Sequence, residues 1–565
     1  MSVRRVAGRG FAGASLIALL AAGSWAAGAI AAPTGPRPAT STAPIAPPTP
    51  ELPRPATPPP LSTPTNARPA GAPAPPSPSA LSSAPAPKAT YSEAAVEPMK
   101  LYDEERCSEA LPGLRALAAR ADFPADDAEQ AIPLWDALAW CANRLEQYGE
   151  AHDALVKATA YEEASAEFWE ARLYAAAAAK RWPDVLTSME TLAERDPALF
   201  RTVSFASMDA IWSWLEAGSS LETRFLEVIW NSGWQPDDPF QSADSFLIIH
   251  AERLRAAGDE RLARRVLRGV TSPGNIYVAR LHPGLKTFIP VEPSGMNIRA
   301  TAERRVSALA LRAYGDPDRI DLVLAQADLI RRLGRPAEAL ALLDGTRRRV
   351  DLEPDKGGYR DIVRMRGHWW SYRADVLFDL GRDDEALAGM AYAAALPEVA
   401  DGVADTRNVT QVGQLADLQL RLGRYDEAIA TLDRLRGRED VTDAGRIGHA
   451  RIRACALAGK GDREGAARIA KRNAKLAEAG QFQWIRMQLC AGEQDAVAKA
   501  YIARLTASDA EKAMALEELG PYGRRARRTS FTDAEEARWD ALRKRPDMAK
   551  AIRDAGGLEP WPMVP

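Results

Sequence analysis

The chain has little of the chemistry that metal centres and thiol enzymes need. Its 565 residues include only 4 cysteines and 5 histidines, which leaves little room for a metal site or a thiol nucleophile. The HExxH, GxSxG, Walker A and paired CxxC motifs are also missing from the sequence. The formal net charge is only −3, so no basic field indicates a nucleic-acid partner. We therefore expect a protein without cofactor or metal, which is not an enzyme and does not bind nucleic acid.

The first 32 residues have the pattern of a secretory signal. Arg4, Arg5 and Arg9 precede an uncharged, largely apolar run over 11–32 that ends in small residues. A positive start, an apolar middle and a small-residue exit are the three parts of a signal peptide, which predicts export to the periplasm or cell envelope. The alternative is a retained anchor, because the 22 uncharged residues of the run can just span a bilayer. In that case residues 11–32 would tether the protein to the membrane.

Residues 33–88 form a proline- and alanine-rich segment. They hold 20 of the chain's 41 prolines and almost no aliphatic side chains. Such a segment cannot bury enough apolar surface to offset its ordering entropy, so we expect a disordered linker. From Ala89 onward the chain has a globular composition, and its 66 basic and 75 acidic residues give a net charge of −9.

A turn phrase recurs in the second half of the chain. The pattern Leu-Gly-Arg-x-x-Glu-Ala begins at Leu333, Leu380 and Leu422. Each copy has helical periodicity on both sides, so each is typical of the corner of a helix hairpin. The glycine ends the first helix by taking a positive φ, and the small alanine lets the second helix pack closely.

These hairpins resemble the tetratricopeptide repeat (TPR), a 34-residue unit of two helices. When the turn glycine is set at unit position 15, position 4 often holds tryptophan, and positions 8 and 20, where the two helices touch, mostly hold alanine. The matching residues are Trp135, Trp169 and Trp370 at position 4, Ala139, Ala251, Ala327, Ala374 and Ala416 at position 8, and Ala151, Ala263, Ala339, Ala386 and Ala428 at position 20. The resemblance covers most of 91–505 and implies an all-α, right-handed α-solenoid of stacked hairpins, whose concave groove binds a protein or peptide.

The resemblance also divides the chain. We expect an N-terminal half of the solenoid over 89–270, a C-terminal half over 296–505, and a C-terminal cap and tail over 506–565, because the ends of a solenoid must be covered. Between the halves, 271–295 carries four prolines and three glycines. With so little helical period, this segment is predicted to be a non-helical insertion.

The resemblance gives candidate groove residues, because certain positions of the first helix line the groove of TPR solenoids. Position 9 holds Asp328, Asp375 and Asp417 in three consecutive units, and Arg332 and Arg421 occupy position 13. A row of carboxylates would focus a negative potential and suit a basic or amine-bearing partner, although the aspartates could instead pair with neighbouring arginines. Neutralising all three is then expected to weaken partner capture and hardly to change melting.

His368 is a further candidate for the same groove. It occupies position 2 of its unit, just before Trp369 and Trp370. There it could bind an anion or act as a base, but no residue that would orient the imidazole can be identified.

The four cysteines are spaced by about one repeat. Cys107 and Cys141 are 34 residues apart, and Cys455 and Cys490 are 35 apart. In stacked hairpins this spacing can bring the thiols level with each other, so we expect local disulfides formed in an oxidising compartment, with Cys107–Cys141 as the stronger case. The alternative is that all four are small buried hydrophobes.

The sequence as a whole favours a non-enzymatic scaffold of the cell envelope, which binds a partner protein or peptide in the groove of the solenoid. One alternative is a protein that binds cell-wall glycan through the tryptophans between Trp212 and Trp234. Another is an accessory or catalytic subunit of an envelope enzyme. Some soluble lytic transglycosylases also wrap a long α-superhelix, but they add a compact catalytic domain, for which the end of this chain is too short.

Overall fold

The computed structural model describes residues 89–289, 297–400, 403–405, 409–438, 441–477, 480–520, 527–560 and 563. The predicted signal segment and linker, residues 1–88, lie outside these ranges. The described chain is a helical repeat solenoid, to which a short antiparallel pair, β1 (Glu398–Ala400) and β2 (Val403–Asp405), is added. Within these ranges, no helix has both the length and the apolar character needed to cross a bilayer.

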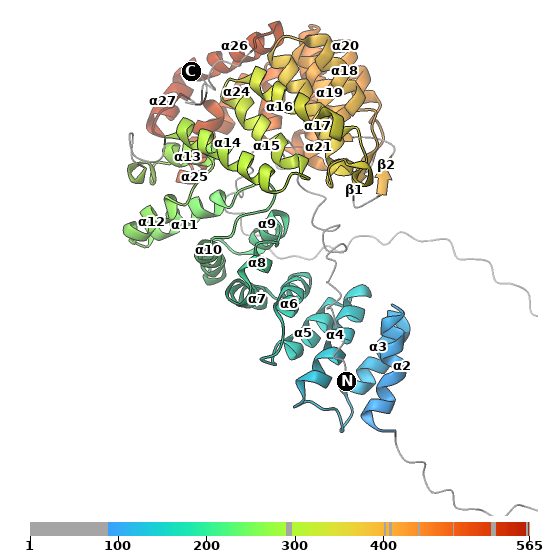
Figure 1. The fold of residues 1–565 in the computed structure, drawn as a ribbon. Helices are drawn as coiled ribbons and strands as arrows, with labels where there is room; N and C mark the ends of the chain where they lie inside the picture. The colour runs from blue at the N-terminus through green and yellow to red at the C-terminus, as the bar shows by residue number, and fades with distance from the viewer. Residues whose placement is uncertain are drawn as a thin grey trace, which may run out of the picture.

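The N-terminal helices form an extended arm (Figure 1). Consecutive helices of the arm pair as hairpins, α2 with α3, α4 with α5, and α6 with α7. The helices are α2 (Tyr91–Asp103), α3 (Cys107–Ala118), α4 (Ala128–Arg144), α5 (Tyr148–Ala158), α6 (Ala166–Ala178), α7 (Trp182–Arg195), α8 (Pro197–Phe200), α9 (Phe205–Trp214) and α10 (Ser220–Ser232). Two further helices, α11 (Asp244–Ala256) and α12 (Glu260–Leu267), join the arm to the rest.

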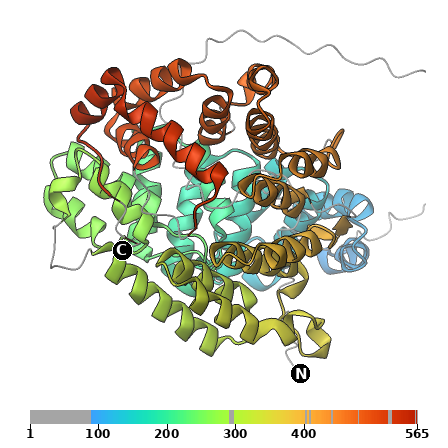
Figure 2. The ribbon, with the colours of Figure 1, turned by 90° about the horizontal axis from the view of Figure 1, so that it is seen from above.

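The remaining helices curl into a ring, seen from above in Figure 2. They are α13 (Pro273–Leu281), α14 (Ile298–Gly315), α15 (Ile320–Arg332), α16 (Pro336–Val350), α17 (Ile362–Asp379), α18 (Asp383–Ala393), α19 (Val409–Arg421), α20 (Tyr425–Asp433), α21 (Asp443–Gly459), α22 (Arg463–Arg472), α23 (Gln481–Ala491), α24 (Gln494–Leu505), α25 (Asp509–Leu519), α26 (Ser530–Lys544) and α27 (Pro546–Asp554). Short 3-10 turns occur at η2 (Lys286–Phe288), η3 (Pro354–Lys356) and η4 (Ala474–Leu476).

The ring closes because its C-terminal end returns to its first helix. Helix α25 packs against α13. The Tyr277 hydroxyl donates a hydrogen bond of 2.5 Å to the carbonyl oxygen of Glu559, and Arg280 lies 3.0 Å from the Glu559 carboxylate. Arg299 donates to the carbonyl oxygen of Met563 at 3.0 Å. These contacts join residues more than 260 positions apart, so the predicted C-terminal cap closes the solenoid on itself.

The expected non-helical insertion over 271–295 is largely wrong. Pro273 begins helix α13, where a proline at the first helical position costs no hydrogen bond. Ile276 and Tyr277 are buried on this helix, which packs on α25. The turn η2 follows, and residues 290–295 lie outside the described ranges. Among the described prolines of this segment, Pro273 therefore begins a short helix and Pro283 follows its end.

The hairpin turns explain why the Leu-Gly-Arg phrase recurs only in the second half of the chain. Gly334, Gly381 and Gly423 have φ values of +80°, +78° and +74° at the hairpin corners of the ring. In the arm the same corner position holds Glu146 and Lys180, with φ values of +59° and +58°. A non-glycine residue in this left-handed region is strained, and a search for glycine misses it.

Two disulfides join neighbouring units. Cys107 on α3 is bonded to Cys141 on α4, with a Cα–Cα distance of 4.8 Å, and Cys455 on α21 is bonded to Cys490 on α23, with a distance of 5.0 Å. All four side chains are buried. The structure thus pairs the cysteines as their spacing suggested, and each bond ties one helix hairpin to the next.

We expect no reactive thiol in denatured, unreduced protein, and four after reduction, by titration with a thiol reagent. Serine at both Cys107 and Cys141 should lower the free energy of unfolding by about 2–4 kcal/mol, because the loop that the bond closes in the unfolded chain becomes free. Four reactive thiols in unreduced protein would contradict both pairings.

Candidate functional site

The structure brings the three predicted aspartates into one row. Asp328 lies on α15, Asp375 on α17 and Asp417 on α19, and α17 packs against both neighbours. Two arginines bridge the row. Arg331 lies 3.8 Å from Asp328 and 3.7 Å from Asp375, and Arg421 lies 2.7 Å from Asp375 and 3.1 Å from Asp417. The repeat register identified every member of this group except Arg331.

The row is an ion-pair ladder. Arg332 lies 2.7 Å from Asp328 at one end, and Arg451 lies 2.5 Å from Asp417 at the other. Burial alone would raise the pKa of Asp417, but Arg451 and two further arginines outweigh it and hold that pKa well below its usual range. Each carboxylate of the row is therefore paired with guanidinium groups, as the alternative for these aspartates had it, and the row does not present the focused negative potential that was also considered.

His368 is neutral at physiological pH. Burial, together with the positive charge of Arg364, lowers the pKa of its imidazole to about 4. Its Nδ1 atom lies 3.5 Å from the side-chain amide of Gln411. A neutral imidazole of such low basicity offers neither the positive charge for an anion nor an effective base, so the role considered for His368 has no support in this geometry.

The inner side of the ring is occupied by its own helix α26. The Thr529 hydroxyl donates to the carbonyl oxygen of Arg421 at 2.7 Å, before the helix begins. Phe531 packs into the apolar cluster of α19, α20, α21 and α23. Further along, Glu535 lies 2.7 Å from Arg486, and the Trp539 ring stacks on Phe482 with 6.3 Å between centroids. The predicted groove is thus partly filled from within, over α19 to α23.

The arm carries a different set of side chains on its first helices. We call Tyr102, Asp136, Trp140, Glu170 and Tyr174 the arm face. Asp136 and Glu170 are 34 residues apart on α4 and α6, and so are Trp140 and Tyr174. Tyr102 on α2 precedes Asp136 by the same interval, and its hydroxyl donates to the Asp136 carboxylate at 3.4 Å. A one-unit spacing therefore repeats acidic and aromatic side chains at equivalent positions.

The carboxylates of the arm face have no basic partner among the residues that the structure describes. Burial raises the pKa of Asp136 to about 6, and the hydrogen bond from Tyr102 offsets only part of this effect. Burial and the neighbouring Glu167 also raise the pKa of Glu170. Burial and Glu170 raise the pKa of the Tyr174 hydroxyl to about 12. Carboxylates that are desolvated without a counter-charge favour a cation, and perturbed groups of this kind often mark functional sites.

Sequence reasoning missed the arm face. The signal was available in the 34-residue interval from Asp136 to Glu170 and from Trp140 to Tyr174. The interval alone does not distinguish these residues, because the sequence does not show which carboxylates are paired with an arginine.

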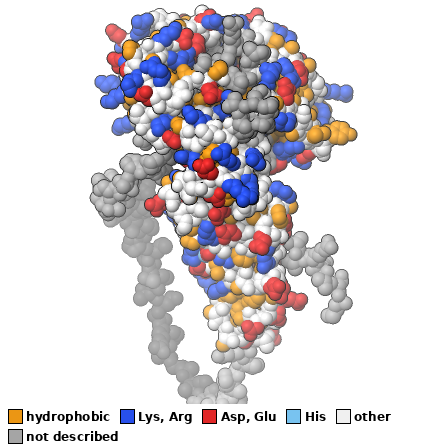
Figure 3. Space-filling model, turned by 90° about the vertical axis from the view of Figure 1, so that its left-hand side faces the viewer, with side chains coloured by type: hydrophobic (Ala, Val, Ile, Leu, Met, Phe, Trp, Pro, Cys, Tyr) orange, Lys and Arg blue, Asp and Glu red, His pale blue; other side chains and the backbone are white. Residues whose placement is uncertain are grey.

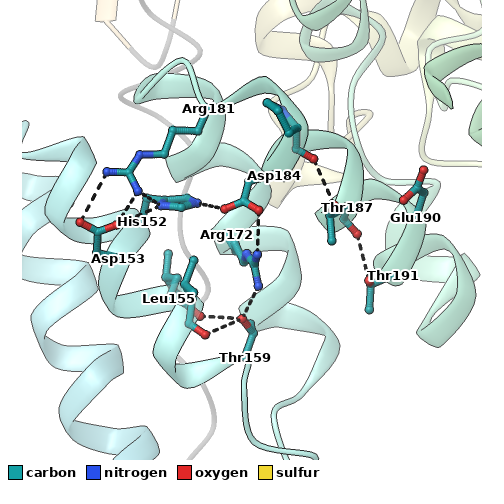
Figure 4. A network of polar contacts seen from close by, with 12 residues as sticks. His152, Asp153, Leu155, Thr159, Arg172, Arg181, Asp184, Thr187, Glu190 and Thr191 are labelled. Atoms are coloured by element: carbon teal, nitrogen blue, oxygen red, sulfur yellow. Dashed lines mark hydrogen bonds and ion pairs between the residues drawn. The ribbon is translucent and has the colours of Figure 1, made fainter. Parts of the chain in front are cut away.

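A polar network holds the hairpins of the arm together (Figure 4). The buried His152 places its Nε2 atom 2.6 Å from the Asp184 carboxylate. Arg172 donates to Asp184 at 3.0 Å and to the Thr159 hydroxyl at 2.8 Å, while Arg181 lies 2.9 Å from His152 Nδ1. Because these residues belong to α5, α6 and α7 or flank them, the network fixes the spacing between units that the arm face requires.

Other candidate features offer no enclosed site. Trp234 and Trp212 are buried, so neither can stack on a sugar, whereas Trp214 is 53% exposed and its ring stacks on Trp182 with a 5.9 Å centroid separation. A hollow of about 380 Å³ between α3, α4 and α5 is lined by the ion pair of Arg115 and Glu150. Within the described ranges, no three histidine, cysteine or acidic side chains come together as a metal site would require.

Comparison with known proteins gives little beyond the fold. No family model matches the chain, and no curated protein matches it. Solved structures similar to it include the pentatricopeptide repeat protein PPR10 in complex with an 18-nt psaJ RNA element, and a variant of that protein with three cysteines replaced by serine, bound to the same RNA. Each is 14% identical with a TM-score of 0.19, and the match covers 82% of this chain and 74% of the other.

Both of these structures hold RNA, whereas from the sequence nucleic acid was excluded as a partner of this chain. That exclusion depended on the net charge of the whole chain, whereas contact with a phosphate backbone depends on local basic surface. Lysine and arginine side chains are in fact spread among acidic ones over both the ring and the arm (Figure 3). The exclusion is therefore withdrawn.

Proposed function

We propose that the protein is a non-enzymatic interaction scaffold of the cell envelope, whose arm binds a cationic segment of a partner protein. The observation that carries this proposal is the arm face, on which Asp136 and Glu170 stand one repeat apart, partly desolvated and without a basic partner among the described residues. Lysine or arginine side chains of a partner would supply the missing charge. The Tyr174 ring offers a face on which a cation can rest, as Arg144 of this chain already does over the Trp140 ring at 5.4 Å.

The ring has a different role in this proposal. Its ladder of paired charges and its own helix α26 leave the ring as a closed body that carries the arm. The envelope location is supported by the signal pattern of residues 1–32 and by the two disulfides, which persist in oxidising compartments. The proline-rich segment 33–88 would set the distance between the solenoid and its point of export or attachment.

The test is site-directed crosslinking in intact cells. A photo-crosslinking amino acid replaces Tyr174 on the arm face and, as a control, Tyr314, which is 88% exposed on α14. We expect a protein adduct at position 174 that is absent at position 314 and is lost when Asp136→Asn and Glu170→Gln are added. Identical adducts at both positions, or an adduct that survives the two neutral substitutions, would contradict the proposal. Recovery of glycan alone, especially near Trp214, would favour the glycan-binding alternative.

Asp136→Asn alone is expected to raise stability while it weakens capture. The pKa of Asp136 is raised to about 6 in the folded protein, so the folded state holds the proton more tightly than the unfolded chain. The free energy of unfolding therefore falls as the pH rises between about 4 and 6. The cost of burying the ionised Asp136 carboxylate is fully present at pH 7. Removing it should raise the free energy of unfolding at pH 7 by about 1–2 kcal/mol, with no gain below about pH 4.

Urea titration at pH 7.5 and at pH 3.5 measures this difference. Glu163→Gln, at an exposed position just before helix α6, serves as the control and should change little at either pH. A loss of stability in Asp136→Asn at pH 7.5 would mean that the carboxylate stabilises the packing of the arm. Asp136 would then no longer count as a binding residue of the arm face.

A further inference from the structure

Arginine side chains gather inside the ring beneath helix α26. Arg451 lies on α21, Arg486 on α23 and Arg538 on α26 itself. Arg486 donates two hydrogen bonds, of 2.9 and 2.7 Å, to one oxygen of Glu535. The guanidinium of Arg538 lies 3.8 Å from the sulfur of Cys490. Three positive groups from three helices therefore meet around the single carboxylate that α26 brings to this place.

Arg451 is the most buried of these three arginines and lacks the most hydrogen-bond partners. It is only 6% exposed, and one of its guanidinium nitrogens donates to Asp417 at 2.5 Å. The other two nitrogens, Nε and Nη1, are buried without a hydrogen-bond partner in the described chain, and so is Nε of Arg538. Buried guanidinium N–H groups are strong donors that proteins rarely leave unpaired, so these nitrogens call for additional acceptor atoms.

The charges of the cluster also favour an additional anion. Asp417 is shared between Arg451 and Arg421, and Glu535 is held by Arg486. Within the described ranges, Arg538 therefore has no carboxylate of its own. Burial lowers the pKa of Arg451, the positive charge of Arg486 lowers it further, and Asp417 does not restore it. Burial also lowers the pKa of Arg538. The cluster thus carries more positive than negative charge in a place from which water is largely excluded.

An oxyanion would supply both the missing hydrogen-bond acceptors and the missing negative charge. Phosphate and sulfate offer several acceptor oxygens and negative charge, and their hydrogen bonds with arginine are among the strongest in proteins. A water molecule would supply acceptors but no charge. We propose that a tetrahedral oxyanion of the phosphate class binds at Arg451, between α21, α23 and α26, and holds α26 inside the ring. This site is separate from the arm face, and its existence does not depend on the proposed function.

Equilibrium dialysis of the full chain with labelled inorganic phosphate tests the site. At constant ionic strength set with chloride, we expect one saturable site per chain. We also expect a higher melting temperature in about 10 mM phosphate or sulfate, because an anion that binds only the folded state stabilises it. Arg451→Met should weaken phosphate binding by roughly tenfold or more, since it removes the central donor. Arg348→Met serves as the matched control, because Arg348 is exposed on α16, and should bind as the unchanged protein does.

Arg538→Gln is a second variant that tests the site even if the Arg451 variant does not fold. Arg538 is only half-buried, so its replacement should leave the circular dichroism spectrum intact while it weakens phosphate binding by roughly threefold or more. A phosphoserine peptide that displaces the labelled phosphate would show that the natural ligand is a phosphate group on a larger molecule, and failure to displace it would indicate the free ion. Absence of saturable binding, or equal binding in wild type and both variants, would overturn the site.

Discussion

Asp417→Asn is expected to lower the free energy of unfolding by about 2–4 kcal/mol. The Asp417 carboxylate is only 29% exposed and lies 2.5 Å from Arg451 and 3.1 Å from Arg421. Removal of its charge leaves two guanidinium groups without their counter-charge where water is scarce, and breaking a buried pair on one side costs more than the pair itself contributes. From the sequence, by contrast, neutralising Asp328, Asp375 and Asp417 together was expected to weaken partner capture and hardly to change melting.

The pH dependence of stability provides a second measurement of the ion pairs that Asp417 makes. Its pKa is held below the usual range in the folded protein, so the unfolded chain binds the proton more tightly. The stabilisation is therefore present above about pH 4 and is lost as the pH falls further. Wild type should lose stability steeply in acid, and Asp417→Asn should lose less, so that the two curves approach each other below about pH 4.

Asp384→Asn is the matched control for Asp417→Asn. Asp384 also faces an arginine, with 3.6 Å between Arg424 and its carboxylate, but its side chain is 98% exposed. Such surface pairs contribute at most about 0.5–1 kcal/mol. Urea titration should separate the two variants clearly, and hydrogen exchange should localise the effect to α19 and α21. An equal, small effect of both substitutions would show that the ladder is solvated, and would restore the ring as a candidate acidic groove.

Much of the helical architecture could be predicted because each repeat unit has characteristic residues at its turn and at its helix contacts. The corners at Gly334, Gly381 and Gly423 need a positive φ, which selects glycine. The contact positions of the two helices need small residues, and Ala374 and Ala416 are buried there as expected. The same register also placed Asp328, Asp375 and Asp417 in one row, because equivalent positions of stacked units are neighbours in space.

The rest depended on contacts that no local pattern encodes. Whether Asp375 remains a free carboxylate depends on Arg421, 46 residues later. Whether the ring has an open groove depends on α26 and the residues just before it, where Arg527 pairs with Asp383 across 144 residues. Position within a unit could therefore predict which side chains share a face, but it could not predict which of them find partners, and this is why the acidic site was expected in the ring rather than in the arm.

Trp539→Ala is expected to be the most damaging single substitution in α26, with a loss of about 3–5 kcal/mol. The indole is 7% exposed, stacks on Phe482 and meets the Tyr501 ring at a centroid distance of 6.1 Å. Its removal leaves a cavity where α26 rests on α23 and α24. Trp214→Ala is the control, because that indole is 53% exposed and should lose only about 0.5–1.5 kcal/mol, from its stacking on Trp182.

The two tryptophan variants also separate the roles of the ring and the arm. If α26 is an integral part of the ring, Trp539→Ala should lower stability and increase hydrogen exchange along α23 and α24, while capture through the arm face stays unchanged. If α26 instead only occupies a groove meant for a partner, the same substitution should leave stability almost intact and create a new crosslinked partner on α19 to α23. The second result would move the binding site back to the ring, and the carboxylates of the arm would then need another explanation.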